Sequence, residues 1–374
     1  MTRSSSSSRL QKAFLKYQHV FVFTAPVAFV LAVVFLAPTG SAGGTDYWLR
    51  YWWLLPFFLL GATIVNTVGI SGSALFVPFL IFAFPVLAGY LAPDALIEVP
   101  LTPETIVKVG LISESFGLSS SSIAFIQYGL VDRRVALTLV GGAVPFVVGG
   151  ALLSFIVPEP VFHALLGLAL LASSVLLFRA DLGHEEPAGD GADAAAAAET
   201  DGGDPSLPND DDKLGPAGVD TDEQGQVTRV DREGDRYDYT RGGYLERFAN
   251  YSVGGVFQGL AGFGIGELGI ISMLRTKVPV RVAIGTNHIV VATTAVLASL
   301  VHVFGGGLVP GAHSIDLAST PWNMVVWTVP ATVTGGQIAP YVASALDTET
   351  IKHGVGVLFA VIATALFVMA AGLV

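Results

Sequence analysis

Long apolar runs dominate the chain, and their lengths predict helices that cross a membrane. A helix needs about 20 residues to span the hydrocarbon of a bilayer. We expect one membrane helix in each of the following runs: Val20–Ala37, Ile106–Tyr128, Val135–Val157, Val161–Phe178, Val282–Phe304, Trp322–Leu346 and Val355–Val374. The first run follows a basic, serine-rich start, which favours a retained anchor over a cleaved signal peptide, whose apolar core is usually shorter.

Two further apolar stretches, Leu54–Ala92 and Asn250–Leu274, are interrupted by glycines near their middle. The first interruption lies in VGISGSALFVP, residues 68–78, and the second in FGIGELGIISM, residues 263–273. Glycine favours a turn at these points, so each stretch is expected to form two half-helices that enter the membrane and return on the same side.

The elements after each interruption also repeat in the same order. A helix that runs from a proline to a double glycine follows in each half, as VPFVVGG in residues 144–150 and as VPATVTGG in residues 329–336. Another apolar run then begins at His163 in the first half and at His353 in the second. Two similar halves with broken helices are typical of secondary transporters, because the irregular backbone of both halves can line one central site.

Composition supports a membrane protein and places the charge. Apolar residues make up 52% of the chain and charged residues only 13%, which a soluble domain of this size could hardly hide from water. The net charge of −11 comes from residues 180–247, which hold 19 acidic and 6 basic residues. This stretch is rich in Gly, Pro and Asp, so we expect a disordered, acidic linker. Its composition is also typical of proteins from salt-loving archaea.

The expected fold class is an all-α polytopic membrane protein of two inverted repeats. Each repeat is a glycine-broken, re-entrant hairpin followed by three transmembrane helices, and one extra helix precedes the first repeat. The domains are a basic start with the first helix in residues 1–50, the first repeat in 51–179, the cytoplasmic linker in 180–247 and the second repeat in 248–374.

Lysine and arginine, which gather in cytoplasmic loops, predict the orientation. The basic start places the N-terminus inside the cell, and the acidic segment around Asp94 and Glu98 is then outside. If both broken stretches return to the side they entered from, the remaining basic clusters and the linker are cytoplasmic: Arg133, Arg134, Arg179, Arg275, Lys277 and Arg281. The first hairpin then enters from outside and the second from inside, as inverted repeats require.

The glycine-rich segments carry a resemblance to a known family. NTVGISGSALFVPFL, LAGFGIGELGIISML, RVAIGTNHIVVATTAVLASLVHVFGG and the two Pro-to-Gly-Gly helices are similar to the pattern of the sulfite exporter TauE/SafE permeases. The similarity extends from about Leu59 to Val374 apart from the linker. It implies transport of small sulfur-containing or organic anions, such as sulfite and sulfonates. In this chain Ser71 and Ser73 stand where the family repeats glycine, and Glu267 lies in the second interruption.

Physical chemistry also favours an anion site at the interruptions. A helix that restarts after a glycine-rich turn presents free backbone N–H groups, whose partial positive charge can hold an anion. We expect the substrate site to be built from residues of both interruptions and from the polar start of the helix that follows the second: Asn66, Gly69, Ser71, Gly72, Ser73, Gly262, Gly264, Gly266, Thr286 and Asn287. Close helix packing is the alternative role for these glycines.

Ionisable residues inside the apolar runs are a further sign of function, because burying a charge is costly. Glu114, Glu267 and His288 are candidates for carrying a coupling proton. Either carboxylate could instead be a structural partner of Lys108 or of a histidine. Lys108 lies near the predicted outer end of its helix, where its side chain is expected to reach the interface.

A second class of function is an intramembrane serine protease of the rhomboid type. Gly69-Ile70-Ser71-Gly72 fits its GxSG pattern, and His302 could act as the base of a Ser–His dyad. The second half has no serine at the matching GIGE, and a duplicated plan has no use in a protease. We therefore favour a transporter without enzyme activity.

The expected partners are a small anion, the lipid bilayer and a coupling ion, either a proton or sodium. We expect no cofactor and no nucleic-acid partner. A metal site is also not expected, because the chain lacks cysteine and its histidines lack ligand spacing. It leaves open which anion is moved, the direction of transport, the coupling ion and the oligomeric state.

Overall fold

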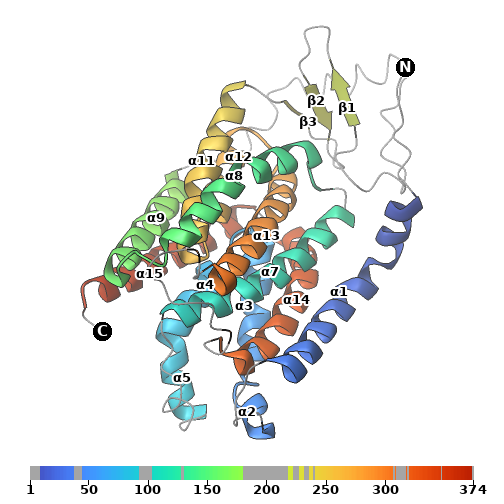
Figure 1. The fold of residues 1–374 in the computed structure, drawn as a ribbon. Coiled ribbons are helices and arrows are strands. Elements are labelled where there is room, and N and C mark those ends of the chain that lie inside the picture. The colour runs from blue at the N-terminus through green and yellow to red at the C-terminus, as the bar shows by residue number, and fades with distance from the viewer. Residues whose placement is uncertain are drawn as a thin grey trace.

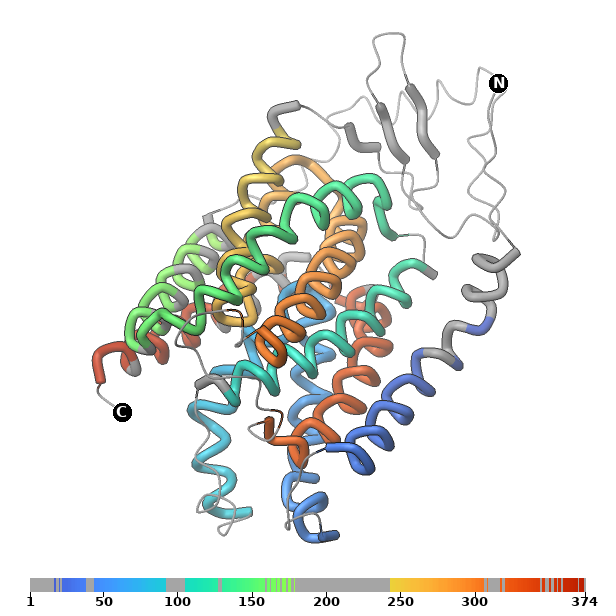
Figure 2. The backbone as a smooth tube through the Cα atoms, viewed as in Figure 1, coloured from blue at the N-terminus to red at the C-terminus, as the bar shows by residue number. Residues whose placement is uncertain are grey.

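Helices form close to where the apolar runs predict them (Figure 1). The computed structural model describes residues 9–37, 44–91, 103–127, 130–179, 218–221, 227–230, 236–238, 241–305, 308, 317, 320–346 and 348–372. Figure 2 shows the path of the backbone. The acidic segment around Asp94 and Glu98, and most of the linker, lie outside these residues.

The first half contains helices on both sides of its glycine interruption. They are α1 (Arg9–Leu36), α2 (Thr45–Leu49), α3 (Leu54–Val68), α4 (Ser73–Pro78), a π-helical turn (Phe79–Ala83), α5 (Phe84–Leu91), α7 (Pro103–Gln127), α8 (Arg133–Leu153) and α9 (Glu159–Arg179).

The second half follows the same order without an equivalent of α1 and α2. Its helices are α11 (Arg241–Ala261), α12 (Ile265–Arg275), α13 (Val280–Phe304), α14 (Trp322–Ala345) and α15 (Thr348–Ala370).

The linker differs from the expectation of an irregular chain throughout. Three short strands, β1 (Gly218–Thr221), β2 (Val227–Val230) and β3 (Arg236–Asp238), form an antiparallel sheet in the order β1-β2-β3. Valine and tyrosine in these short segments favour strands. Helix α11 begins at Arg241, within the stretch assigned to the linker, so the helical second half starts earlier than its composition suggests.

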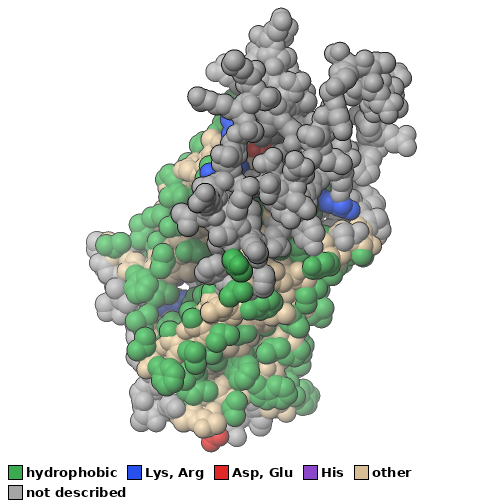
Figure 3. Space-filling model, turned by 90° about the vertical axis from the view of Figure 1, so that its right-hand side faces the viewer, with side chains coloured by type: hydrophobic (Ala, Val, Ile, Leu, Met, Phe, Trp, Pro, Cys, Tyr) green, Lys and Arg blue, Asp and Glu red, His purple; other side chains and the backbone are tan. Residues whose placement is uncertain are grey.

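Several helices are suited to a bilayer. Within the described residues, five segments are long and apolar enough to cross a membrane: Thr45–Val68, Ser73–Leu91, Thr105–Ile126, Arg133–Leu153 and Val280–Phe304. Hydrophobic side chains cover much of the helical body in Figure 3. Large apolar residues on several helices are exposed, among them Phe35, Leu60, Tyr90, Leu168 and Val361. The chain is a multi-pass membrane protein.

The first interrupted stretch turns back on itself. Aromatic contacts join the arm that contains α3 to the segment from α4 to α5. Residues later in the first arm contact residues earlier in the second. Trp53 stacks on Phe84 with ring centroids 5.5 Å apart, and Phe58 stacks on Phe76 at 4.4 Å. The two arms are therefore antiparallel and form a hairpin whose tip lies at Gly69–Gly72.

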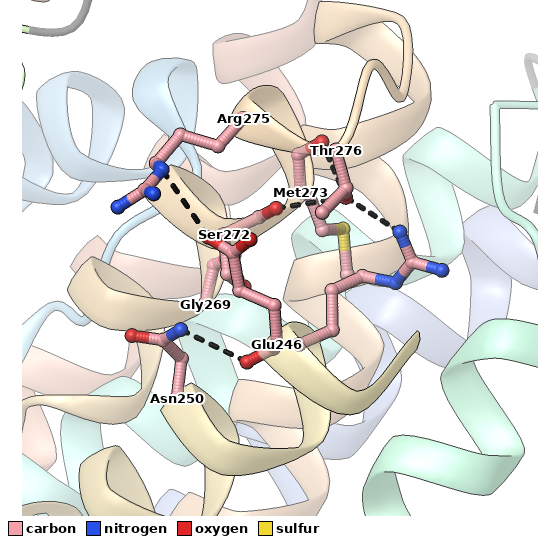
Figure 4. A network of polar contacts seen from close by, with 8 residues as sticks. Glu246, Asn250, Gly269, Ser272, Met273, Arg275 and Thr276 are labelled. Atoms are coloured by element: carbon pink, nitrogen blue, oxygen red, sulfur yellow. Dashed lines mark hydrogen bonds and ion pairs between the residues drawn. The ribbon is translucent and has the colours of Figure 1, made fainter. Parts of the chain in front are cut away.

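The second interrupted stretch forms a matching hairpin from α11 and α12. Near its open end, Arg275 pairs with Glu246 at 3.2 Å, and Arg247 donates to Thr276 (Figure 4). At 11 residues, α12 is about 16 Å long, roughly half the thickness of the hydrocarbon. The second hairpin therefore enters the bundle and returns to the same end.

The two hairpins have their open ends at opposite ends of the bundle. Figure 1 shows α2 and α5 at the lower end, and the start of α11 at the upper end. Helices of the two halves pack in pairs, with one helix from each half in every pair. Helix α3 lies along α14, α11 along α8, α7 against α13, and α9 against α15.

One or both glycines of each pair make these close packings possible. A Cβ added at Gly335 of α14 would lie 2.7 Å from the Leu59 oxygen of α3. A Cβ at Gly150 of α8 would collide with the Val256 oxygen of α11. The repeated Pro-to-Gly-Gly pattern thus gives each half a helix face with few side-chain atoms, against which the hairpin of the other half packs closely.

Candidate functional site

Glycines with positive φ create the two interruptions. Gly69 ends α3 with φ +76°, and its N–H donates to the Val65 oxygen. The second interruption needs two such residues, Gly262 with φ +85° and Gly264 with φ +124°. Residues with a Cβ rarely adopt these conformations, so glycine is required for the chain to turn at these points.

The two hairpin tips touch each other in the middle of the bundle. A Cβ added at Gly266 of the second tip would lie 2.6 Å from the Ser71 nitrogen of the first. A Cβ at Gly262 would lie 3.3 Å from the Ser73 Cβ. Residues separated by almost two hundred positions in the sequence therefore form one structure, which we call the tip junction: Gly69, Ser71, Gly72, Ser73, Gly262, Gly264 and Gly266.

Asn287 of α13 fastens the tip junction. Its Nδ2 donates to the Gly69 oxygen at 2.6 Å and to the Gly266 oxygen at 2.8 Å. Its Oδ1 accepts a hydrogen bond from the Tyr251 hydroxyl of α11. One side chain therefore binds both interruptions and the long arm of the second hairpin.

A buried carboxylate binds backbone N–H groups of both tips. Glu267 Oε1 accepts from the Ser71 nitrogen at 3.2 Å, and Glu267 Oε2 accepts from the Gly264 nitrogen at 2.7 Å. The N–H groups released by the glycine turns thus point toward the oxygens of a single carboxyl group, as their partial positive charge favours.

A second carboxylate binds the first tip from α7. Glu114 Oε2 accepts hydrogen bonds from the Ser73 nitrogen at 2.9 Å and from the Ser73 hydroxyl. Gln258 of α11 links this group to the other tip, since its Nε2 donates to Glu114 Oε1 at 3.3 Å and its Oε1 accepts from the Ser71 hydroxyl at 3.1 Å.

The whole polar network is shielded from the outside. Exposed fractions are 0% for Ser71, Ser73, Gln258 and Asn287 and 1% for Glu114 and Glu267. Burial of this many polar groups is tolerated because each carboxylate oxygen accepts a hydrogen bond. The arrangement is a closed site between two opposed hairpins.

Some predicted site residues lie away from the tip junction. Thr286 Oγ1 accepts from the Asp132 nitrogen at 2.8 Å and so holds the connection between α7 and α8. His288 Nδ1 is 3.0 Å from the Ser121 hydroxyl, and its ring lies edge-on to Phe125. Both residues neighbour Asn287 in sequence, but the turn of α13 directs their side chains elsewhere.

Asn66 and Lys108 also differ in their surroundings from the tip residues. Asn66 Nδ2 donates to the Ala62 oxygen of its own helix at 2.7 Å, and its buried Oδ1 has no hydrogen-bond partner in the described part of the chain. Lys108 is only 4% exposed, so the expected extension toward the interface is wrong.

Sequence reasoning missed Gln258 and Tyr251. Each is a polar residue on the long arm of the second hairpin, four residues before Gly262 for Gln258 and eleven for Tyr251, and each is fully or almost fully buried. Their position in an apolar arm could have identified them, because a hydrogen-bonding side chain there needs a partner inside the bundle. The partners, Ser71 with Glu114 and Asn287, come from distant segments.

The geometry gives no Ser–His dyad at the GxSG segment. The Ser71 hydroxyl donates to Gln258, and His302 Nε2 lies 2.8 Å from the Gly259 oxygen. The described residues also hold no group of three histidines and carboxylates placed to bind a metal ion.

In a comparison with protein-family models, residues 54–366 match the model described as sulfite exporter TauE/SafE. No curated protein and no solved structure matches the chain. The matched segment includes both hairpins, the tip junction and both double-glycine helices. Members of this family are transporters, so the protease alternative is wrong. The chain belongs to the sulfite exporter TauE/SafE family of membrane transporters.

Proposed function

We propose that the chain is a secondary transporter that moves small sulfur-containing or organic anions, such as sulfite or sulfonates, and binds them at the tip junction. The observation that carries this proposal is the meeting of two glycine-broken hairpins, where the N–H groups of Ser71, Ser73 and Gly264 already donate to carboxyl oxygens. Backbone N–H groups in such turns bind oxyanions without a buried positive side chain.

The packing supports an inverted repeat in this proposal. If the two halves exchange places, α3 maps onto α11, α7 onto α13, α8 onto α14 and α9 onto α15. The pairing of α3 with α14 then becomes the pairing of α11 with α8, while the pairs α7–α13 and α9–α15 map onto themselves. A two-fold relation of this kind, with open ends on opposite sides, suits alternating access from the two faces of a membrane.

The basic residues support a cytoplasmic location for the end of the bundle at which α11 begins. Asp132 before α8, Arg247 of α11 and Thr276 after α12 lie near one another there. The sequence neighbours of these residues include the basic clusters Arg133–Arg134 and Arg275–Arg281. Lysine and arginine are concentrated on the cytoplasmic side of membrane proteins.

Single-cysteine labelling tests this orientation, because the chain has no cysteine of its own. Cysteines introduced at Asp210 and Lys277 are expected to react only with reagents that reach the cytoplasm. A cysteine at Leu96 is expected to react from outside. Labels at Asp210 and Lys277 on opposite faces would contradict the re-entrant second hairpin and the inversion with it.

Anion binding to the purified full chain tests the function. Sulfite, thiosulfate, sulfate and methanesulfonate are titrated at several pH values, with a neutral sugar as the control ligand. At least one anion is expected to bind. Ser71→Ala keeps the backbone N–H and removes the hydroxyl, so it is expected to weaken binding by at most one hydrogen bond, roughly 1–3 kcal/mol if that bond is charge-assisted. Failure of every anion to bind at any pH would overturn the proposed function.

A further inference from the structure

The two carboxylates occupy the same hydrogen-bond donors that the proposed function assigns to the transported anion. Glu267 takes the N–H groups of Ser71 and Gly264, and Glu114 takes the N–H and hydroxyl of Ser73. A backbone N–H has a single hydrogen to donate. A substrate can therefore gain these hydrogen bonds only if the carboxylates release them.

Within the described residues, the hydrogen-bond donors to both carboxylates are neutral groups. They include the backbone N–H groups of Ser71, Ser73 and Gly264, the Ser73 hydroxyl and the Gln258 amide. The two carboxylates lie close together, because both accept from the first tip, at Ser71 and Ser73, and Gln258 bonds to Glu114 and to Ser71. A third negative charge brought into this closed site would meet repulsion in a poorly screened interior.

Other titratable groups on the surrounding helices bind different partners. Tyr251 of α11 donates to Asn287, and on α13 His288 lies against Ser121 and His302 against Gly259. Lys108 precedes Glu114 by six residues on α7, about 9 Å along the axis. Further titratable residues on the helices that pack around the tips include His163 of α9, Tyr341 of α14 and His353 of α15.

We propose that Glu114 and Glu267 are internal competitors of the transported anion, so that anion binding takes up a proton. This inference rests on the proposed function. A proton from solution binds one carboxylate, the neutral carboxyl group releases its N–H donors, and the incoming anion accepts them. For a singly charged anion the charge of the buried site is unchanged by the exchange, which avoids the cost of a third buried negative charge.

A purely structural role predicts a different behaviour. Glu267 is the third residue after Gly264 and binds its N–H, so it could serve only to cap the start of α12. Glu114 could serve only to hold α4 against α7. In that case anion binding involves no proton, and the affinity for an anion of fixed charge does not change with pH.

Calorimetric titration of the purified full chain separates the two roles. Methanesulfonate and sulfate are used as probes because neither changes its charge in the range from about pH 5.5 to 8.5. Titrations in two buffers with different ionisation enthalpies give the number of protons taken up. We expect about one proton per methanesulfonate, with a dissociation constant that rises by up to about tenfold per pH unit where the carboxylates are charged.

Two variants locate the proton. Glu267→Gln and Glu114→Gln keep the size of the side chain and remove its charge, so each is expected to reduce proton uptake and to strengthen binding at high pH by about tenfold. Glu246→Gln, at the open end of the second hairpin, is the matched control and is expected to keep the proton uptake and pH dependence of the unmodified chain.

The wild-type titration decides the matter even if a glutamine variant fails to fold. Binding without proton uptake and with a constant affinity from low to high pH would overturn the proposal and leave the transport function standing. Proton uptake that persists unchanged in both glutamine variants would also overturn it. If neither the wild-type chain nor either variant binds any anion, the proposed function fails together with this inference.

Discussion

Replacing Asn287 with leucine is expected to give one of the largest losses of stability of any single substitution in the bundle. Leucine has a similar size but cannot donate to the Gly69 and Gly266 oxygens or accept from the Tyr251 hydroxyl. Each buried polar group left without a partner costs about 1–3 kcal/mol. The three groups together predict a loss of roughly 3–9 kcal/mol, measured as a fall in the thermal unfolding midpoint of the detergent-solubilised protein.

Two further variants show whether the effect comes from the tip junction. Thr293→Val on the same helix removes a hydroxyl that bonds only to the Ile289 oxygen of its own helix, and should cost less than about 1 kcal/mol. Tyr251→Phe should destabilise the wild-type protein but have little further effect once Asn287 is leucine. An Asn287→Leu protein as stable as the Thr293→Val protein would show that Asn287 does not hold the tips together.

The helices and the two interruptions could be predicted because they depend on local sequence. A run such as Val282–Phe304 is apolar over a bilayer's thickness, and the structure places α13 at Val280–Phe304. Gly69 and Gly264 could be read as turns because few other residues adopt positive φ. The order of the repeated elements then indicated which interruptions would meet.

The choice of side chains at the tip junction depends on helix rotation, which local sequence does not reveal. Thr286, Asn287 and His288 are adjacent and all polar, yet only Asn287 contacts both tips. Successive residues on a helix point about 100° apart, so a rotation of α13 by about that angle would have selected a different one. The rotation is set by packing against α7, α8 and α12, which belong to both halves.

Long-range hydrogen bonds explain why the sequence did not identify Gln258. They also explain why it left open whether Glu114 carries a proton or is a structural partner of another residue. Glu114 and Gln258 are separated by 144 positions, and their contact exists only because the second hairpin reaches the first. The sequence offered Lys108 as a partner for Glu114, since both lie on one helix. The structure instead gives Glu114 a backbone N–H, a serine and an amide.

Gly266→Ala is expected to impair transport more strongly than its small size suggests. The added methyl group would lie 2.6 Å from the Ser71 nitrogen and 2.9 Å from its hydroxyl, so the two tips must move apart. Overpacking of this kind costs typically about 1–3 kcal/mol, which corresponds to a roughly 5- to 150-fold change in an equilibrium constant. We expect a loss of that size in anion uptake by proteoliposomes, normalised to the amount of folded protein.

Helix propensity makes this test informative, because alanine favours a helix over glycine by about 1 kcal/mol. Gly266 lies in the first turn of α12, so α12 itself should form at least as well in the variant. Gly149→Ala is the matched control, since a Cβ at that position of α8 would meet no atom within 4 Å. Transport should be near normal in Gly149→Ala and strongly reduced in Gly266→Ala. Equal transport by the two variants would mean that contact between the hairpin tips is not needed for moving the anion.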